Sequence, residues 1–361
     1  MTYVLYFMAL GSNFFASLRN RRSKLVLGFS ALVILLLWVG YADGPDILNY
    51  QLHFDLIGER VALHGWSQIL FNRPMYYLKS IGFSFYQYRF SVTLMALMLI
   101  YVCLVKLRTN IHLVLCGYLS SAFFLEGIQF RNFLAIPFLL FGVLLLIRRN
   151  PGWRIWYILT ILIAAFIHNT FVVYLIFLFL PAPHSSIRKI IWVYGLLALG
   201  LTIFFFMFRN HLNVITNVLM AYDERRTLQF SHYVTKWGTF VPVILQGMAI
   251  YTVRFIRLKL SKRHNISQQD LQTIQTILGI DLLACFFLPL CILQITFYRL
   301  IRNLLLVNWA AIGIGSYYLR KNLIFNLLVI AYMTAWMIAE FRLMNTFEAI
   351  VQPLFSSNLY L

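Results

Sequence analysis

The stretch IWYILTILIAAFIHNTFVVYLIFLFLPA, residues 155–182, decides how this chain crosses a membrane. It is long enough for a single crossing, because about 20 apolar residues span a bilayer. Basic residues flank it on both sides, with RRNPGWR at 148–154 before it and Arg188 and Lys189 after it. Basic loops stay in the cytoplasm. We therefore expect both flanks on one side and the stretch to be a hairpin.

The two arms of this hairpin are short. Each has about 13 residues, or roughly 20 Å at 1.5 Å per residue, against a hydrocarbon core of about 30 Å. The tip, His168, Asn169 and Thr170, is therefore expected to lie recessed below the outer surface. Non-helical backbone at that depth is tolerated only when it is buried in protein or lines a wet cavity. A single crossing would instead put the most basic loop, RFIRLKLSKR at 254–263, outside.

The composition of the whole chain is that of a polytopic membrane protein. Of its 361 residues, 61% are hydrophobic and 11% charged, with a mean hydropathy of +0.78. Soluble domains are about 25% charged, so a soluble enzyme, a disordered chain and a conventional nucleic-acid binder are excluded. We expect one all-α domain, 1–361, with about 12 transmembrane segments. They are 2–18, 25–41, 87–106, 110–126, 130–147, 155–167, 169–182, 190–208, 237–256, 273–293, 303–319 and 322–340.

The charges orient these segments. Most of the 30 basic residues fall in inner loops, and most of the 11 acidic residues fall outside. This is the positive-inside pattern, so the net charge of +19 is assigned to topology and no nucleic-acid partner is expected. Both termini are expected to face outward, as are two long loops at 42–86 and 209–236. The cysteines at 103, 116, 285 and 291 lie in apolar runs and are interpreted as core residues.

Charged side chains at membrane depth cost about 2.5–3.5 kcal/mol each at a helix centre, so they mark functional cavities or pairs that hold helices together. The first polar cluster at the outer face is YADGPDILNYQLHFD, 41–55, which carries Asp43 and Asp46. It could also be a solvated loop in which Asp46 caps a short helix. The second is FLEGIQFRNF, 124–133, where Arg131 heads a descending helix. Its alternative interpretation is a Glu126–Arg131 pair that stabilises the turn.

Two further clusters complete the outer set. His168 lies at the expected hairpin tip, and it is either a functional group or a satisfied core histidine. Arg299 and Arg302 in ITFYRLIRNLLLVNW, 295–309, are three residues apart at the outer end of a span. Two guanidiniums on one helical face suit a diphosphate, which Arg binds through planar, bidentate hydrogen bonds. The alternative is snorkelling to lipid phosphate.

Asp281 lies in the middle of an expected span. It is either a proton-coupling carboxylate or a side chain hydrogen-bonded to a neighbouring helix. The chain carries no P-loop, GxSxG, GxGxxG, zinc-ligand spacing or DxD pair. We therefore expect neither a metal nor a cofactor.

The four outer clusters, in this order and spacing, resemble the EpsG family of Wzy-type polysaccharide polymerases. The motifs that carry the resemblance are GPDILNY (44–50), RNFLAIPFLL (131–140), FIHNTF (166–171) and FYRLIRN (297–303). The resemblance implies a bacterial inner-membrane glycosyltransferase that joins lipid-linked oligosaccharide repeat units at its periplasmic face. Undecaprenyl-diphosphate-linked oligosaccharide would be both donor and acceptor, and a chain-length regulator and a flippase would be possible partners in the bilayer.

The chemistry of such a reaction assigns the site residues. Arginines can stabilise the departing diphosphate in place of a metal, and a histidine or carboxylate can accept the proton of the attacking hydroxyl. The expected catalytic residues are His168, Asp46 and Arg131. The residues expected to bind diphosphate or sugar are Arg299, Arg302, Asp43, Tyr50 and Tyr298.

Two other classes of protein share parts of this pattern. A lipid-linked oligosaccharide flippase or another transporter would have polar residues along a central path, and internal inverted symmetry would favour it. An O-antigen ligase would share the lipid donor and the outer arginines. A membrane acyltransferase would need an inward His or Asp cluster, which the sequence does not show.

Overall fold

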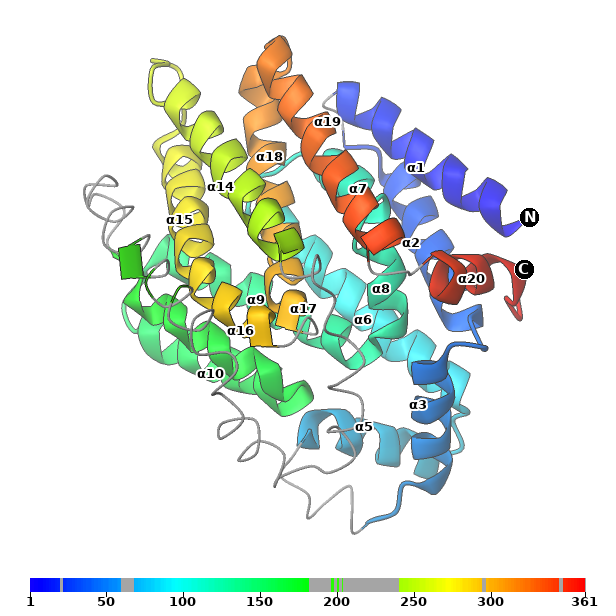
Figure 1. The fold of residues 1–361 in the computed structure, drawn as a ribbon. Helices are drawn as coiled ribbons and strands as arrows, with labels where there is room; N and C mark the ends of the chain where they lie inside the picture. Colours follow the sequence, from blue (N-terminus) through cyan, green and yellow to red (C-terminus); the bar gives the residue numbers. More distant parts are fainter. Residues whose placement is uncertain are drawn as a thin grey trace.

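The computed structural model describes residues 1–19, 22–59, 68–181, 240–293, 297–343 and 347–360, together with residues 196, 197, 200 and 203. Within these residues the fold is helical, and its one β-bridge joins Tyr41 to Asn358. The all-α class is therefore confirmed (Figure 1). The outer loop expected at 209–236 and most of the span expected at 190–208 lie outside the described residues.

Most of the expected segments among the described residues are helical, although the span expected at 110–126 is interrupted at residues 120–122. In chain order they are α1 (Thr2–Arg19), α2 (Lys24–Gly40), α3 (Pro45–Leu56), α5 (Ile69–Ser80), α6 (Phe85–Lys106), α7 (Ile111–Leu119), α8 (Phe123–Ile128), α9 (Phe130–Arg148), α10 (Trp153–Ile167), η1 (Asn169–Phe179), α14 (Phe240–Leu260), α15 (Gln268–Ala284), η2 (Cys285–Phe287), α16 (Leu288–Leu293), α17 (Tyr298–Arg302), α18 (Leu305–Leu319), α19 (Leu323–Ile338), η4 (Ala339–Leu343), η5 (Phe347–Val351) and α20 (Gln352–Ser356).

In the described part of the chain, 5 helices are long and apolar enough to cross a membrane. They are α6, α9, α14, a run over Gln268–Cys291 that includes α15, and a run over Leu323–Phe341 that includes α19. Helix α2, helix α10 and the η1 segment are apolar but shorter. The chain is thus a membrane protein with several spans, and the count of about 12 crossings stays a prediction.

The loop expected at 42–86 contains two helices rather than open chain. Helix α3 begins with Pro45 in its first turn, where proline's missing N–H costs nothing. Its Phe54 packs edge-on against Phe85 of α6, with the ring centroids 5.9 Å apart. Aromatic packing against α6 therefore folds a segment whose polar residues made it look like a loop.

The hairpin expected at 155–182 is present. Helix α10 ends at Ile167, and the backbone of the next residue, His168, is extended (φ −143°, ψ 108°) before the 3-10 segment η1 begins. Tyr157 donates a hydrogen bond to the carbonyl of Tyr174 at 2.6 Å, so the two arms lie side by side. The Arg149 guanidinium, just before α10, donates to the carbonyl of Leu180 at 3.0 Å. The second arm of the hairpin thus returns to the level at which the first arm begins. The depth of the hairpin tip in the membrane stays a prediction.

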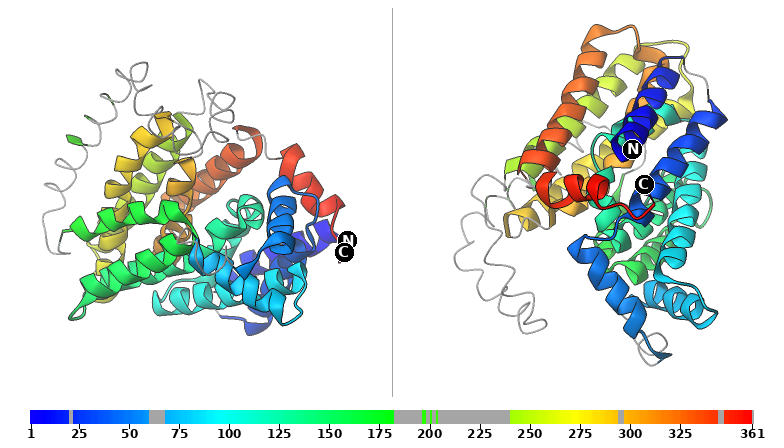
Figure 2. Two further views of the ribbon diagram at one scale, coloured as in Figure 1. Left: turned by 90° about the horizontal axis from the view of Figure 1, so that it is seen from below. Right: turned by 90° about the vertical axis from the view of Figure 1, so that its right-hand side faces the viewer.

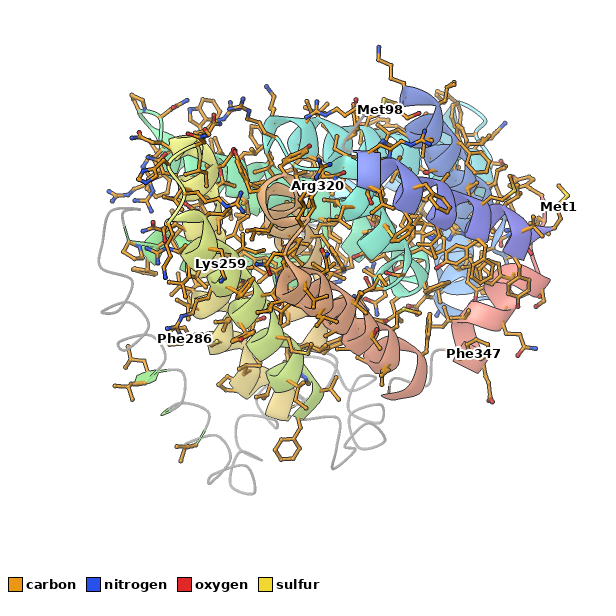
Figure 3. The ribbon with its side chains drawn as sticks, turned by 90° about the horizontal axis from the view of Figure 1, so that it is seen from above. Met1, Met98, Lys259, Phe286, Arg320 and Phe347 are labelled. Atoms are coloured by element: carbon orange, nitrogen blue, oxygen red, sulfur yellow. The ribbon has the colours of Figure 1, made fainter. Side chains whose placement is uncertain are left out.

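Basic turns and polar clusters lie at opposite ends of the bundle. The α1–α2, α14–α15 and α18–α19 turns lie at the upper end in Figure 1, and α3, α5 and α17 lie at the lower end. At the upper end, Arg108 donates to Gln269 at 3.2 Å and joins the α6–α7 turn to α15. Figure 3 looks down on this end, where Arg320 is labelled at the α18–α19 turn. Which end faces the cytoplasm stays a prediction from the charges.

The two termini lie side by side (Figure 2). Thr2 donates its hydroxyl to the carbonyl of Phe355 at 2.8 Å. Asn358 donates to the carbonyls of Leu36 and Leu37, and a Cβ at Gly40 would collide with its side chain. The C-terminal segment is therefore hydrogen-bonded to the end of α2, immediately before the first outer polar cluster.

Candidate functional site

Three charged side chains from distant parts of the sequence meet at the lower end of the bundle. Asp46 in the first turn of α3 interacts electrostatically with Arg299 of α17 and with Arg131 of α9. The Asp46 side chain reaches solvent, yet partial burial raises its pKa above the ordinary value, and the two guanidiniums oppose that rise. Arg131 and Arg299 are both partly exposed. The site is therefore an accessible patch with two positive charges and one negative.

Arg131 is held in place by the two helices that replace the expected loop. Its Nε donates to the hydroxyl of Tyr50 at 3.4 Å, and its Nη1 donates to Oε1 of Gln68. The guanidinium carbon lies 5.3 Å from the ring centre of Tyr50 and 5.7 Å from that of Phe71. Stacking on two aromatic faces orients the guanidinium plane without neutralising its charge.

Glu126 does not pair with Arg131, so that alternative interpretation of the second cluster is wrong. Its carboxylate is buried and accepts a hydrogen bond from the hydroxyl of Tyr118. The cation close to it is Arg302. Arg131 is consequently free of a carboxylate within its own turn and is oriented toward α3 and α5.

The two arginines of α17 have different surroundings. Arg302 is only 1% exposed, donates to Oε1 of Gln129, and lies close enough to Glu126 and Glu340 to interact with both. Arg299 instead faces Asp46. The structure thus places Arg302 behind the patch, where it compensates two buried carboxylates, and Arg299 within it.

Tyr298 and Asp43 have partners other than Arg131 and Arg299. The Tyr298 hydroxyl donates to Glu340 at 3.3 Å, and its buried ring stacks on Trp336 at 5.7 Å between centroids. Asp43 is exposed and interacts electrostatically with Tyr41 and Tyr86, on the side of α6. Neither residue shares the surroundings of Arg131 and Arg299.

His168 lies at the same end of the molecule as Arg131. A Cβ at Gly142 of α9 would stand 3.0 Å from Tyr157 and 3.4 Å from Ile161, which sets the antiparallel register of α9 and α10. Arg131 is 11 residues back from Gly142, and His168 is 7 residues on from Ile161. At a rise of about 1.5 Å per residue, Arg131 lies about 16 Å along α9 from this contact, and His168 lies about 10 Å along α10 from it. Because the two helices are antiparallel, both displacements lead toward the same end of the bundle.

The hairpin that carries His168 also contacts α17. The hydroxyl of Tyr174 in η1 donates to the carbonyl of Leu300 at 2.8 Å. The His168 ring is half-buried, and its Nδ1 lies 2.7 Å from the hydroxyl oxygen of Thr170. This contact helps to orient the ring.

The sequence analysis did not identify several residues in and around the site. Gln68 and Phe71 lie in the expected loop, and no pattern pointed to them. Arg89 is 1% exposed and donates to the carbonyls of Tyr41 and Gly127 at 2.8 Å each, which ties α2 to α8. Glu340 could have been identified from the sequence, because a charged residue at the end of an apolar run needs a partner.

The patch can bind a polyanion. Two accessible guanidiniums, one of them flanked by the rings of Tyr50 and Phe71, suit phosphate oxygens and sugar faces. Asp46 beside them, or His168 at the same end of the bundle, can accept a proton. In the described part of the chain, no group of 3 or more His, Cys, Asp or Glu side chains is placed to hold a metal ion.

The sequence model of the EpsG family matches residues 25–354, which include every motif described above. No curated protein and no solved structure matches the chain.

Proposed function

The chain belongs to the EpsG family of polysaccharide-polymerase-like membrane proteins, and we propose that it polymerises lipid-linked oligosaccharide repeat units at the outer face of the bacterial inner membrane. Donor and acceptor are both carried on undecaprenyl diphosphate. Both reach the patch from the bilayer, so the patch has to open toward the outer leaflet.

The reaction transfers the growing glycan from one carrier to the next unit. The bond between the anomeric carbon and the diphosphate oxygen breaks, and the diphosphate takes the electron pair. A hydroxyl of the acceptor forms the new glycosidic bond and loses its proton to a base. Arg131 and Arg299 stabilise the departing diphosphate with positive charge that is already in place before the bond breaks. His168 or Asp46 accepts the proton.

One observation carries the proposal: Asp46, Arg131 and Arg299 form one electrostatic cluster although they come from three separate segments. A purely structural cluster would be buried, as the group around Arg302 is. This cluster is accessible and has an excess of positive charge, which suits a diphosphate. Because the guanidiniums supply that charge, we propose that the reaction needs no metal.

The test is polymerisation by purified protein in lipid nanodiscs, supplied with an undecaprenyl-diphosphate-linked repeat unit. A ladder of products is expected, and it persists in EDTA. His168→Ala should slow elongation by about 10²–10⁴-fold if this ring is the base. Loss of the ladder in EDTA with recovery on adding a divalent cation would contradict the metal-independent mechanism.

The glycan profile of a deletion strain separates the alternatives. Single repeat units on the lipid A core indicate a polymerase. Absence of any surface glycan indicates a flippase or a ligase. In the second case the purified protein should be tested for transfer of one complete glycan to lipid A core, which defines a ligase.

A further inference from the structure

A buried polar cluster lies among the C-terminal helices and contains none of the patch residues. Its centre is Asp281 of α15, which is 0% exposed. Gln246 of α14 donates its Nε2 to the backbone carbonyl of Asp281 at 2.7 Å. Asn308 of α18 interacts with the Asp281 carboxyl and donates to the hydroxyl of Tyr332 of α19 at 3.4 Å. Four helices thus each bring one polar side chain to one point.

The oxygen atoms of this cluster are under-satisfied. Both carboxyl oxygens of Asp281, Oε1 of Gln246 and Oδ1 of Asn308 are buried without a hydrogen-bond donor among the described residues. The two amides lie near the carboxyl, but neither reaches it with hydrogen-bond geometry. Burying such a group without a partner is unfavourable, and more so when the group is charged. Four unsatisfied oxygen atoms at one place indicate a ligand that several oxygens can contact at once.

The charge balance indicates what that ligand is. Among the described residues, the groups that face Asp281 are Gln246, Asn308, Tyr332 and Cys285, and none of them is a cation. A buried carboxylate without a counter-charge is unstable. A single proton would neutralise it but would serve as donor to only one of the acceptors. A small cation can contact all of them, and carboxylate and amide oxygens are the ligands that hard cations prefer.

We propose that Asp281, Gln246, Asn308 and Tyr332 form a binding site for a monovalent metal cation of the size of Na⁺. One carboxylate balances one positive charge, whereas a divalent ion would leave an excess charge in the bundle. The bound ion links α14, α15, α18 and α19. Since a ligand that binds the folded state stabilises it by mass action, the ion should raise the unfolding temperature of the protein.

The probe is Na⁺ itself, added to the purified full-length protein at constant ionic strength with choline as the replacement ion. Wild type is expected to show a saturable rise in unfolding temperature, and Asp281→Asn to show none. Asn308→Ala should need at least tenfold more Na⁺ for half the effect. The matched control is Asp270→Asn, on the same helix, where Asp270 accepts from Tyr318 at 2.7 Å and should leave the response to Na⁺ intact.

Direct binding of ²²Na⁺ to wild type and to Asn308→Ala supplies a second measurement, in case Asp281→Asn fails to fold. Saturable binding by wild type that weakens in Asn308→Ala supports the site. No saturable binding, or an equal response in Asp281→Asn, overturns it. A wild-type unfolding temperature that depends on pH and not on Na⁺ also overturns it, because the ligand of Asp281 is then a proton.

Discussion

Asn132 and Asn303, 171 residues apart in the sequence, exchange a pair of side-chain hydrogen bonds. The amide of Asn132 donates to Asn303 at 2.7 Å, and the amide of Asn303 donates back at 3.1 Å. Asn132 follows Arg131 at the head of α9, and Asn303 ends the turn of α17 that carries Arg299. Both side chains are buried. This pair therefore joins the head of α9 to α17, the two helices that carry Arg131 and Arg299.

The first prediction concerns that pair. Asn132→Ala or Asn303→Ala leaves the other buried amide unpartnered and should cost about 1–3 kcal/mol. The double variant should cost less than the sum, because the second change removes the orphaned group. Thermal unfolding of the purified variants measures this, with the exposed Asn326→Ala as control. Strict additivity would mean that the two amides do not depend on one another.

The second prediction concerns the shape of the Arg299 side chain. Arg299→Lys keeps the charge but loses the planar fork that binds a diphosphate bidentately. Polymerisation should fall by about 10²-fold, as for loss of one donor to a developing oxyanion. Arg320→Lys, exposed at the opposite end, is the matched control and should retain the wild-type rate. Equal activity of Arg299→Lys and wild type would rule out bidentate binding there.

The third prediction separates the two arginines of α17. Arg302→Met leaves Glu126 and Glu340 without their shared cation and should destabilise the protein by about 3–5 kcal/mol. Adding Glu126→Gln and Glu340→Gln to it should restore much of that stability. Arg299→Met should abolish polymerisation with a far smaller loss of stability. If both single variants unfold alike, the assignment of Arg302 to the interior is wrong.

The fourth prediction is a pH dependence. Burial raises the pKa of Asp46, so its carboxylate takes up a proton at a higher pH than a free aspartate, whose pKa is about 3.9. If Asp46 is the base, kcat/KM should fall with decreasing pH through that raised value. Asp46→Asn should abolish this acid step, and Asp55→Asn, exposed on the same helix, should keep it. An acid step at or below 3.9 would contradict the role.

The fifth prediction concerns orientation in the membrane. Ser261→Cys lies in the basic α14–α15 turn and Ser356→Cys near the C-terminus, and both serines are exposed. In a background without the native cysteines, an impermeant thiol reagent added to intact spheroplasts should label position 356 and spare position 261. Labelling of both positions, or of position 261 alone, would contradict the expected topology.

The sequence alone determined the class of protein, the positions of most helices and the hairpin at residues 155–182. These follow from local quantities, because apolar length, basic loops and a polar break are properties of short segments. It also pointed to Asp46, Arg131 and Arg299 separately.

Only the tertiary structure decided which polar residues meet. Arg299 and Arg302 look equivalent in the sequence. In the structure Arg299 faces Asp46, whereas Arg302 faces two buried carboxylates. Glu126 contacts Tyr118 rather than nearby Arg131, and the loop at 42–86 folds into helices that hold Arg131 through Tyr50. These partners depend on how helices cross in three dimensions, which no local pattern encodes.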